Sequence, residues 1–173
     1  MTAKIKHFPG TSLSEQDITS GKVLSFYDQL EGKYAWDTGI GIGRYLEALK
    51  EGYLLGAYCR YCRKTVIPPR TVCEWCYHPM DKFVPLKDTG TVNTFSLCYV
   101  TWDVQRIKEP EIPAVIEIDG ASPLHGILHK LGEVDPDQVQ FGLRVQAVWK
   151  PAAEREGAIT DILYFKPLQE GES

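Results

Sequence analysis

The sequence predicts a mainly β protein with an α-helical leader, a metal-binding ribbon and a five-stranded barrel. Three observations carry this prediction: two short helical patterns ahead of residue 52, four cysteines in two C-x-x-C pairs, and period-two alternation of apolar side chains after Pro85. We therefore expect an N-terminal arm with helices at residues 1–56, the ribbon at 57–84, the barrel at 85–168 and a short tail at 169–173.

Helical spacing of apolar residues occurs twice in the leader, over residues 21–34 and 43–51. The second stretch places Tyr45, Leu46 and Leu49 on one stripe. Gly52 is a suitable stop, because glycine readily takes the left-handed conformation that ends many helices. Residues 1–20 hold few large apolar groups and predict an arm or lead-in. Both helices are short, so we expect them to need packing partners.

Alternating or apolar segments predict five strands, at residues 92–101, 112–118, 124–131, 143–149 and 159–165. In the first of them Val92, Thr94, Ser96, Cys98 and Val100 are expected on one face. Residues 135–139 predict a short helix, because Asp135 can cap it and Pro136 suits its first position. Five strands with a short helix between the third and the fourth is the order of an OB-fold barrel.

Charge and hydropathy exclude several classes of protein. The 173 residues carry a formal net charge of -4, whereas proteins that bind the nucleic-acid backbone usually have a basic excess. The sequence has no apolar run near the roughly 20 residues that cross a bilayer, and residues 1–10 lack the apolar centre of a signal peptide. Cysteines in C-x-x-C pairs suit metal binding in a reducing compartment, so a cytoplasmic location is expected.

The four paired cysteines have the spacing C-x2-C-x10-C-x2-C, formed by Cys59, Cys62, Cys73 and Cys76. Each pair can form a tight turn that aims two thiolates at one point, and two such turns complete a tetrahedral shell for zinc or iron. We expect one structural zinc, because four thiolates leave no position for a catalytic water. The alternatives are unligated thiols and a thioredoxin-like redox pair, although neither C-x-x-C follows a strand and opens a helix.

Several of these motifs together resemble a known family. They are Tyr45-Leu46-x-x-Leu49-x-x-Gly52-x-Leu54-x-Gly56-x-x-Cys59-x-x-Cys62, then Pro68-Pro69-Arg70-x-x-Cys73-x-x-Cys76, Gly90-Thr91-Val92, and Asp135-Pro-Asp ahead of Gly142-x-x-Val145. Over about residues 43–150 the chain resembles the OB-fold proteins with an N-terminal rubredoxin-like zinc ribbon that accompany thiolases and HMG-CoA synthase-like enzymes. The resemblance implies a non-catalytic, acyl-CoA-associated subunit that docks on a thiolase-fold partner and helps to house the CoA arm.

The ribbon segment is basic although the chain is acidic. Residues 57–82 carry a net charge of +3, which leaves -7 for the remainder of the total of -4. Guanidinium groups bind phosphate oxygens in pairs, so CoA or an acidic partner surface is the expected contact. We name four residues for it, with Arg70 favoured because two prolines fix its approach: Arg60, Arg63, Lys64 and Arg70. The alternative is a solvated surface whose charges contact nothing.

Other chemistry-bearing side chains favour structural roles. Cys98 lies mid-strand without a base or a helix N-terminus, so we interpret it as a packed small hydrophobe. His125 and His129 would lie about 13 Å apart on a strand, too far for a metal pair. The barrel aromatics are assigned to the core or to a partner interface, with stacking on an adenine ring as the alternative: Phe95, Tyr99, Trp102 and Trp149.

The leading hypothesis is a zinc-containing, acyl-CoA-binding scaffold subunit of a thiolase-type acyltransferase complex, active only as part of a hetero-oligomer. One alternative is an autonomous nucleic-acid-binding OB-fold module, which would need a basic barrel. A second alternative is an acyl-CoA hydratase accessory subunit or an enzyme in its own right. An enzyme in its own right, such as an acyl-CoA hydratase or thioesterase component, would require an acid–base pair on the barrel, where Glu117 and Asp119 are available without a matching base or nucleophile.

Overall fold

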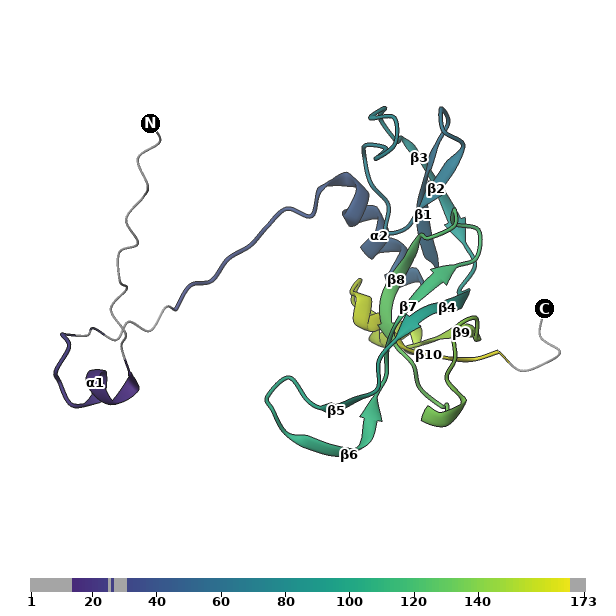
Figure 1. Ribbon diagram of the computed structural model, residues 1–173. Helices are drawn as coiled ribbons and strands as arrows, with labels where there is room; N and C mark the ends of the chain where they lie inside the picture. Colours follow the sequence, from purple (N-terminus) through teal and green to yellow (C-terminus); the bar gives the residue numbers. More distant parts are fainter. Residues whose placement is uncertain (1–13, 25, 27–30, 169–173) are drawn as a thin grey trace, which may run out of the picture. The chain divides into compact units, whose positions relative to one another are not determined.

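The structure is a computed structural model that describes residues 14–24, 26 and 31–168, in two compact units of residues 1–36 and 37–173 (Figure 1). In the first unit, Ser14 and Asp17 form a reciprocal capping box that opens helix α1 (Glu15–Thr19). The expected helix over residues 21–34 is wrong for the described part of that range, which is not helical. Residues 25 and 27–30 of it lie outside the described residues.

Helix α2 (Gly39–Glu51) opens the second unit and confirms the second helical pattern. It ends at Gly52, whose φ of 86° is the left-handed conformation expected of a glycine stop. Its buried side chains Tyr45, Ala48 and Leu49 join the main hydrophobic core. The helix is therefore part of the barrel's packing. No helix in the described part of the chain is both long and apolar enough to cross a membrane.

The ribbon is built on a three-stranded antiparallel sheet of order β2-β1-β3, with β1 at Leu54–Cys59, β2 at Lys64–Val66 and β3 at Lys82–Leu86. Strand β1 belongs to two cores at once. Leu54 and Leu55 pack in the main core, whereas Ala57 and Cys59 pack in the small ribbon cluster. The sheet therefore begins at Leu54, inside the segment that the sequence assigned to the arm.

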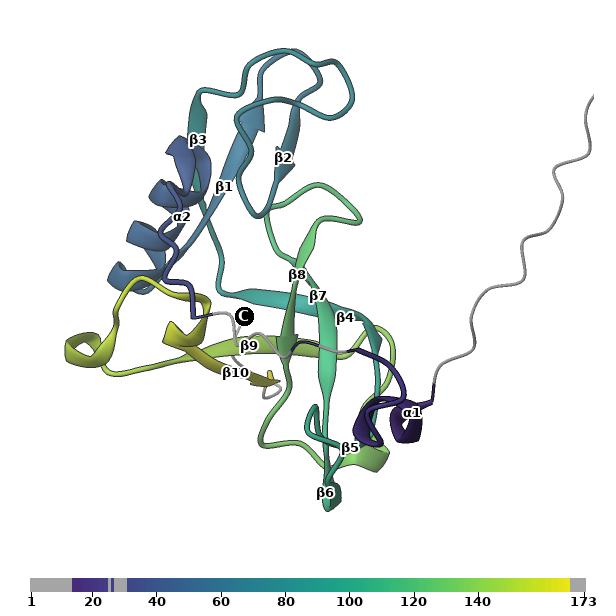
Figure 2. The same cartoon turned by 90° about the vertical axis from the view of Figure 1, so that its left-hand side faces the viewer.

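The barrel is a five-stranded sheet of order β10-β9-β4-β7-β8 (Figure 2). Its strands are β4 (Thr89–Phe95), β7 (Pro113–Ile118), β8 (Gly126–Lys130), β9 (Arg144–Trp149) and β10 (Ile162–Pro167). All neighbours in this order are antiparallel. The ends meet through a parallel bridge between Leu131 and Phe165, where the N–H of Gly132 donates to the Phe165 carbonyl at 2.9 Å. The predicted OB-fold barrel is confirmed, and its closing contact is parallel.

The first predicted strand is divided. A bulge between Val92 and Thr94 breaks the alternation, so Val92 is buried while Thr94 is exposed. The chain leaves the barrel after Phe95 and continues as β5 (Cys98–Val100), which pairs with the unanticipated β6 (Arg106–Glu111) in a separate two-stranded sheet. The single strand predicted over residues 92–101 is therefore wrong. This β5–β6 extension holds no fully buried side chain.

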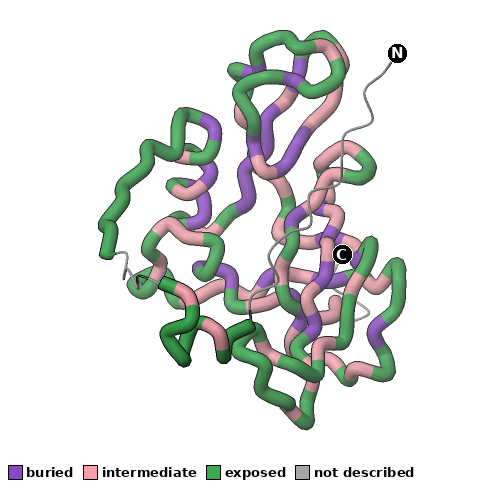
Figure 3. The backbone as a smooth tube through the Cα atoms, turned by 60° about the vertical axis from the view of Figure 1, so that its left-hand side comes forward, coloured by how far each residue is buried: buried purple, intermediate pink, exposed green. Residues whose placement is uncertain are grey.

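Three short 3-10 helices complete the second unit: η1 (Pro136–Gln138), η2 (Ala152–Glu154) and η3 (Ile159–Asp161). The first is the predicted short helix, and the Asp135 side chain accepts from the N–H of Asp137 at 3.0 Å. The third replaces the first turn of the predicted strand at 159–165. It presents Asp161, a fully buried carboxylate that accepts from the N–H groups of residues 156, 157 and 158 at 2.7–3.0 Å. Figure 3 shows buried segments in both the barrel and the ribbon.

Candidate metal centre and the ribbon surface

Two matching turns carry the four cysteines. In each, the residue after the second cysteine has a positive φ, 57° at Arg63 and 58° at Tyr77. Its N–H donates to the carbonyl of the first cysteine, from Arg63 to Cys59 at 2.8 Å and from Tyr77 to Cys73 at 2.9 Å. Glycine is the residue that takes this conformation most easily. Arginine and tyrosine hold it here because the turn must direct two sulfurs to one point.

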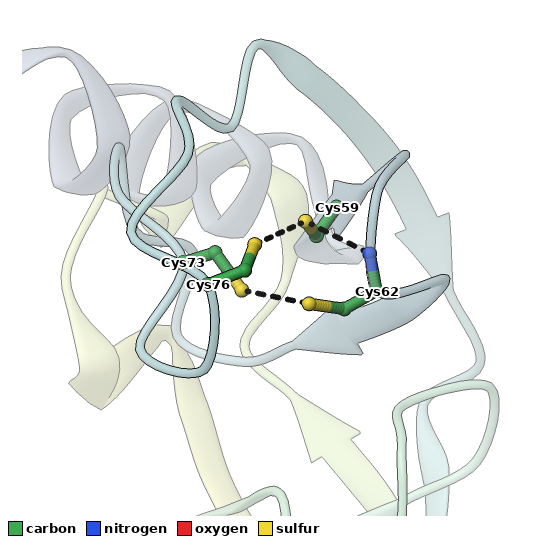
Figure 4. Close-up of side chains that lie close together, drawn as sticks. All are labelled: Cys59, Cys62, Cys73 and Cys76. Atoms are coloured by element: carbon green, nitrogen blue, oxygen red, sulfur yellow. Dashed lines mark hydrogen bonds between the residues drawn. The ribbon is translucent and has the colours of Figure 1, made fainter.

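The four sulfurs form a compact group with the geometry of a tetrahedral zinc site (Figure 4). All ligand atoms lie within 4.8 Å of one another. The Sγ atoms of Cys59 and Cys76 are 3.6 Å apart, and those of Cys62 and Cys73 are 3.8 Å apart. A tetrahedron with Zn–S bonds of ~2.3 Å has sulfur–sulfur edges of about 3.8 Å. The residues therefore fit a structural zinc ion.

Burial and mutual contact disfavour the accumulation of several thiolate charges in this cluster when no cation is present. Cys59 and Cys73 are fully buried, and the other two are half-buried. Hydrogen bonding to the Cys76 sulfur, together with burial, raises the pKa of the Cys62 thiol to about 12. A divalent metal removes this penalty, because it binds the thiolate form and neutralises its charge. The chemistry of the donor set thus agrees with the zinc site predicted from the cysteine spacing.

The four basic residues proposed for ligand contact have different surroundings. Arg60 Nη2 donates to Asp81 Oδ1 at 2.7 Å, and Arg70 forms an ion pair with Glu74. The Lys64 ammonium lies 5.1 Å from the centre of the Trp75 ring. Arg63, the left-handed residue of the first cysteine turn, is exposed. In the described part of the chain, Arg63 and Lys64 are the two of this set with no carboxylate at salt-bridge distance.

A polar contact joins the ribbon to the loop between β7 and β8. The N–H of Thr65 donates to Ser122 Oγ at 2.9 Å, and the N–H of Ser122 donates to the Thr65 carbonyl at 2.8 Å. Beside this pair, the ring of His125 meets the Trp75 ring edge-on at 4.9 Å, and its Nε2 is 3.5 Å from a Glu74 oxygen. Burial lowers the pKa of His125, although the charge of Glu74 acts in the opposite direction. Sequence reasoning missed this contact, because its partners are far apart in the chain.

The remaining residues singled out from the sequence lie apart from one another. Cys98 is half-buried in β5. His129 packs edge-on against Phe165 at 5.7 Å, away from the ribbon contact of His125. Among the aromatics, Phe95 and Trp149 pack against the main core, whereas Tyr99 and Trp102 are 47% and 95% exposed in the β5–β6 extension.

The two barrel carboxylates considered for acid–base chemistry are held in structural contacts. Glu117 accepts from the Asn93 amide at 2.6 Å. Asp119 accepts from Arg144 through both of its oxygens, at 2.8 and 2.5 Å, and from the Thr89 hydroxyl. The Arg144 guanidinium holds the pKa of Asp119 below its ordinary value. Asp119 is therefore ionised and paired with an arginine, and an ionised carboxylate cannot act as a proton donor at neutral pH.

Comparison with known proteins agrees with this two-part construction. Residues 46–78 match the ChsH2 rubredoxin-like zinc ribbon domain, and residues 83–150 match the ChsH2 C-terminal OB-fold domain. A DUF35 domain-containing scaffold protein of Methanocaldococcus jannaschii is 28% identical over 125 residues, which cover 70% of this chain and 86% of that protein.

Two solved structures share the fold. A DUF35 family protein of unknown function from Sulfolobus solfataricus has a TM-score of 0.57 at 18% identity. The aligned part covers 72% of this chain and 82% of that one. The Ltp2-ChsH2(DUF35) aldolase has a chain with a TM-score of 0.56 at 21% identity, covering 78% of this chain and 98% of that one.

The class of protein is thus a rubredoxin-like zinc ribbon followed by an OB-fold domain. Within this class, the two domains are of the ChsH2 type, and the chain is similar to a DUF35 domain-containing scaffold protein. The resemblance stated from the motifs is confirmed.

Proposed function

We propose that the chain is a non-catalytic, zinc-containing scaffold subunit of a thiolase-type acyltransferase complex, in which it walls one side of the tunnel for the pantetheine arm of CoA. The observation that carries this proposal is the joining of ribbon and barrel by strand β1, whose residues pack in both cores. Such a brace can hold two surfaces of a partner at a fixed angle. The name of the archaeal relative and the aldolase complex of a structural neighbour support a role in assembly.

The absence of an activated nucleophile among the described residues supports a non-catalytic role. The four ribbon thiols are grouped as metal ligands, and Cys98 lies in a strand of the β5–β6 extension. The carboxylates of Glu117 and Asp119 are engaged by Asn93 and Arg144. A catalytic cysteine needs a neighbouring base or a helix N-terminus to lower its pKa. Acyl transfer would accordingly belong to the partner.

CoA recognition is assigned to the ribbon surface, where Arg63 and Lys64 offer positive charge to phosphate oxygens. The exposed pairs of Arg60 with Asp81 and of Arg70 with Glu74 contribute little to stability, so their cations can also turn to an anionic ligand. Calorimetry with CoA and with dephospho-CoA tests this assignment. Replacing Arg63 or Lys64 by alanine should weaken CoA binding about tenfold. The control Lys166→Ala, on β10, should stay within about twofold.

Assembly is tested by purifying the affinity-tagged full chain from its native cell and identifying its partners by native mass spectrometry. The proposal expects a stoichiometric complex with a thiolase-fold subunit that condenses or cleaves acyl-CoA only through that subunit. A chain that purifies alone and binds a single-stranded oligonucleotide would contradict it and favour the nucleic-acid alternative. The -7 charge outside the ribbon already weighs against that alternative.

A further inference from the structure

The β5–β6 extension comprises residues 96–111 and is called the β5–β6 arm from here on. It projects from the barrel between β4 and β7 (Figures 1 and 2). At its base the N–H of Ser96 donates to the Pro113 carbonyl at 3.0 Å. Its two strands pair Cys98 with Glu111 and Val100 with Arg106. Every residue of the arm is exposed or half-buried. Its apolar side chains therefore add little to the core, and folding alone does not explain them.

The tip of the arm is an ordered turn. The N–H of Thr101 donates to the Gln105 carbonyl at 2.9 Å, and the N–H of Val104 donates to the Thr101 carbonyl at 3.0 Å. The Thr101 hydroxyl oxygen also accepts from the N–H of Gln105 at 3.1 Å. Val104 has a φ of 66°, a strained conformation for a β-branched residue. Strain of this kind is concentrated at functional sites. The hydrogen bonds of the turn hold the neighbouring residues in a defined position.

The ordered tip presents large apolar side chains to solvent. Trp102 is 95% exposed and Val104 is 79% exposed. Between the tip and the barrel, Leu97, Tyr99 and Val100 have exposures of 37%, 47% and 45%. Tryptophan and tyrosine are the residues that most often dominate the energy of protein interfaces. A preformed aromatic tip on a projecting arm has the form of an anchor.

We infer that the β5–β6 arm is a docking element whose Trp102–Val104 tip enters an apolar recess of the enzyme subunit that this scaffold carries. The inference rests on the proposed function for the identity of that subunit. It adds a second contact region to the ribbon surface and assigns the binding energy to an aromatic anchor. A recess suits the arm because the walls of a recess can contact both faces of its two-stranded sheet.

Area and charge favour this occupant over others. The five exposed apolar side chains offer roughly 500 Å² together, on the scale of 150–250 Å² for a large aromatic. Two arms packed against each other would then bury about 1,000 Å² in total, below the roughly 1,200–2,000 Å² of a stable interface, whereas in the proposed complex the arm adds its area to that of the ribbon contact. The arm also carries three acidic residues, Asp103, Glu109 and Glu111, against two basic ones, Arg106 and Lys108. This balance does not suit a nucleic acid or an anionic lipid surface.

The test measures binding of the full-length chain to the thiolase-fold subunit that co-purifies with it, by biolayer interferometry with the subunit immobilised. Trp102→Ala should weaken binding at least about thirtyfold, because an interface anchor is lost. Trp102→Phe should recover most of the affinity. The matched control Leu128→Ala, at a 68% exposed leucine on β8, should stay within about threefold. Thermal unfolding should show unchanged midpoints, since the arm contributes no buried residue.

The possible contrary results distinguish a failure of the docking role from a failure of the proposed function. Full affinity of Trp102→Ala for the thiolase-fold subunit overturns the docking role of the arm and leaves the proposed function intact. Failure of the wild-type chain to associate with any thiolase-fold subunit overturns the proposed function and the inference with it. A wild-type homodimer that Trp102→Ala dissolves in analytical ultracentrifugation would assign the arm to self-association, which also overturns the inference.

Discussion

The ribbon and the barrel are stabilised by different means although one strand runs through both. The ribbon's own core is a small cluster in which Ala57, Val66 and Met80 surround two of the cysteines. The barrel core is much larger and combines helix α2 with all five barrel strands. Small cores bury too little apolar surface to offset the entropy of ordering the chain. We therefore expect the ribbon to depend on a bound metal and the barrel to depend on packing.

Part of the ribbon is also held by its contacts with the barrel. Leu54 and Leu55 anchor β1 in the barrel core, and the reciprocal bonds between Thr65 and Ser122 hold β2 against the β7–β8 loop. The barrel thus fixes the base of the ribbon, while a metal bound to the four cysteines would fix its two turns. The following predictions separate these contributions.

Loss of a metal ligand should have the largest effect. Cys59→Ser removes a fully buried thiolate, and structural zinc contributes about 10–16 kcal/mol of binding free energy in small metal domains. We expect zinc content, measured by elemental analysis, to fall from one equivalent to below a tenth. Cys98→Ser is the matched control and should retain one zinc per chain. Equal zinc loss in both variants would show that the spacing-based ligand set is wrong.

Truncation of the barrel core should be the next largest effect and should spare the metal. Phe165 is fully buried where β10 closes the barrel against Leu131. Phe165→Ala should lower the free energy of unfolding by about 3–5 kcal/mol in a urea titration. Zinc content should stay at one equivalent under native conditions. A variant that lost its zinc in parallel would mean that the two regions unfold as one.

Removal of the buried carboxylate in the loop after β9 should have an intermediate effect. Asp161 accepts three backbone N–H groups, and Asp161→Asn should lower the free energy of unfolding by about 2–3 kcal/mol. Burial raises the pKa of Asp161, but the bonds from residues 156, 158 and 157 and the charge of Lys150 hold it below the ordinary value of 3.8.

A lowered folded pKa sets the pH dependence of this contribution. The stabilisation by Asp161 is fully present above pH 3.8 and is lost as the pH falls from there through the folded value. The difference between wild type and Asp161→Asn should therefore shrink below about pH 3.8 in denaturant titrations. A difference that stays constant to pH 2 would contradict the ionised role of this carboxylate.

The smallest effect is expected at the junction. Ser122→Ala removes the oxygen that accepts the Thr65 N–H and should cost about 1 kcal/mol. Amide hydrogen exchange should accelerate at residues 64–66 and stay unchanged in the barrel strands. Ser96→Ala, at an exposed serine in the arm, serves as the control. Unchanged exchange at β2 would mean that β1 alone fixes the ribbon on the barrel.

Local signals in the sequence predicted part of this structure. Gly52 ends α2 and Asp135 caps η1, because both act on neighbouring residues. The cysteine spacing gave the metal site for the same reason. The bulge after Val92, the β5–β6 arm and the Asp161 loop were not predicted, since they depend on where the barrel turns. The pairing of Arg60 with Asp81 spans 21 residues of the chain and was likewise invisible to pattern reasoning.

The most direct test of the account is a pair of ¹H–¹⁵N correlation spectra of the full chain, recorded with zinc and after its removal by a chelator under reducing conditions. If the ribbon depends on its metal and the barrel on packing, the amide signals of residues 57–82 should lose their dispersion, while those of β4, β7 and β9 should keep their positions apart from small shifts near Ser122. Retained dispersion in the ribbon without metal, or collapse of the barrel signals together with those of the ribbon, would contradict the account.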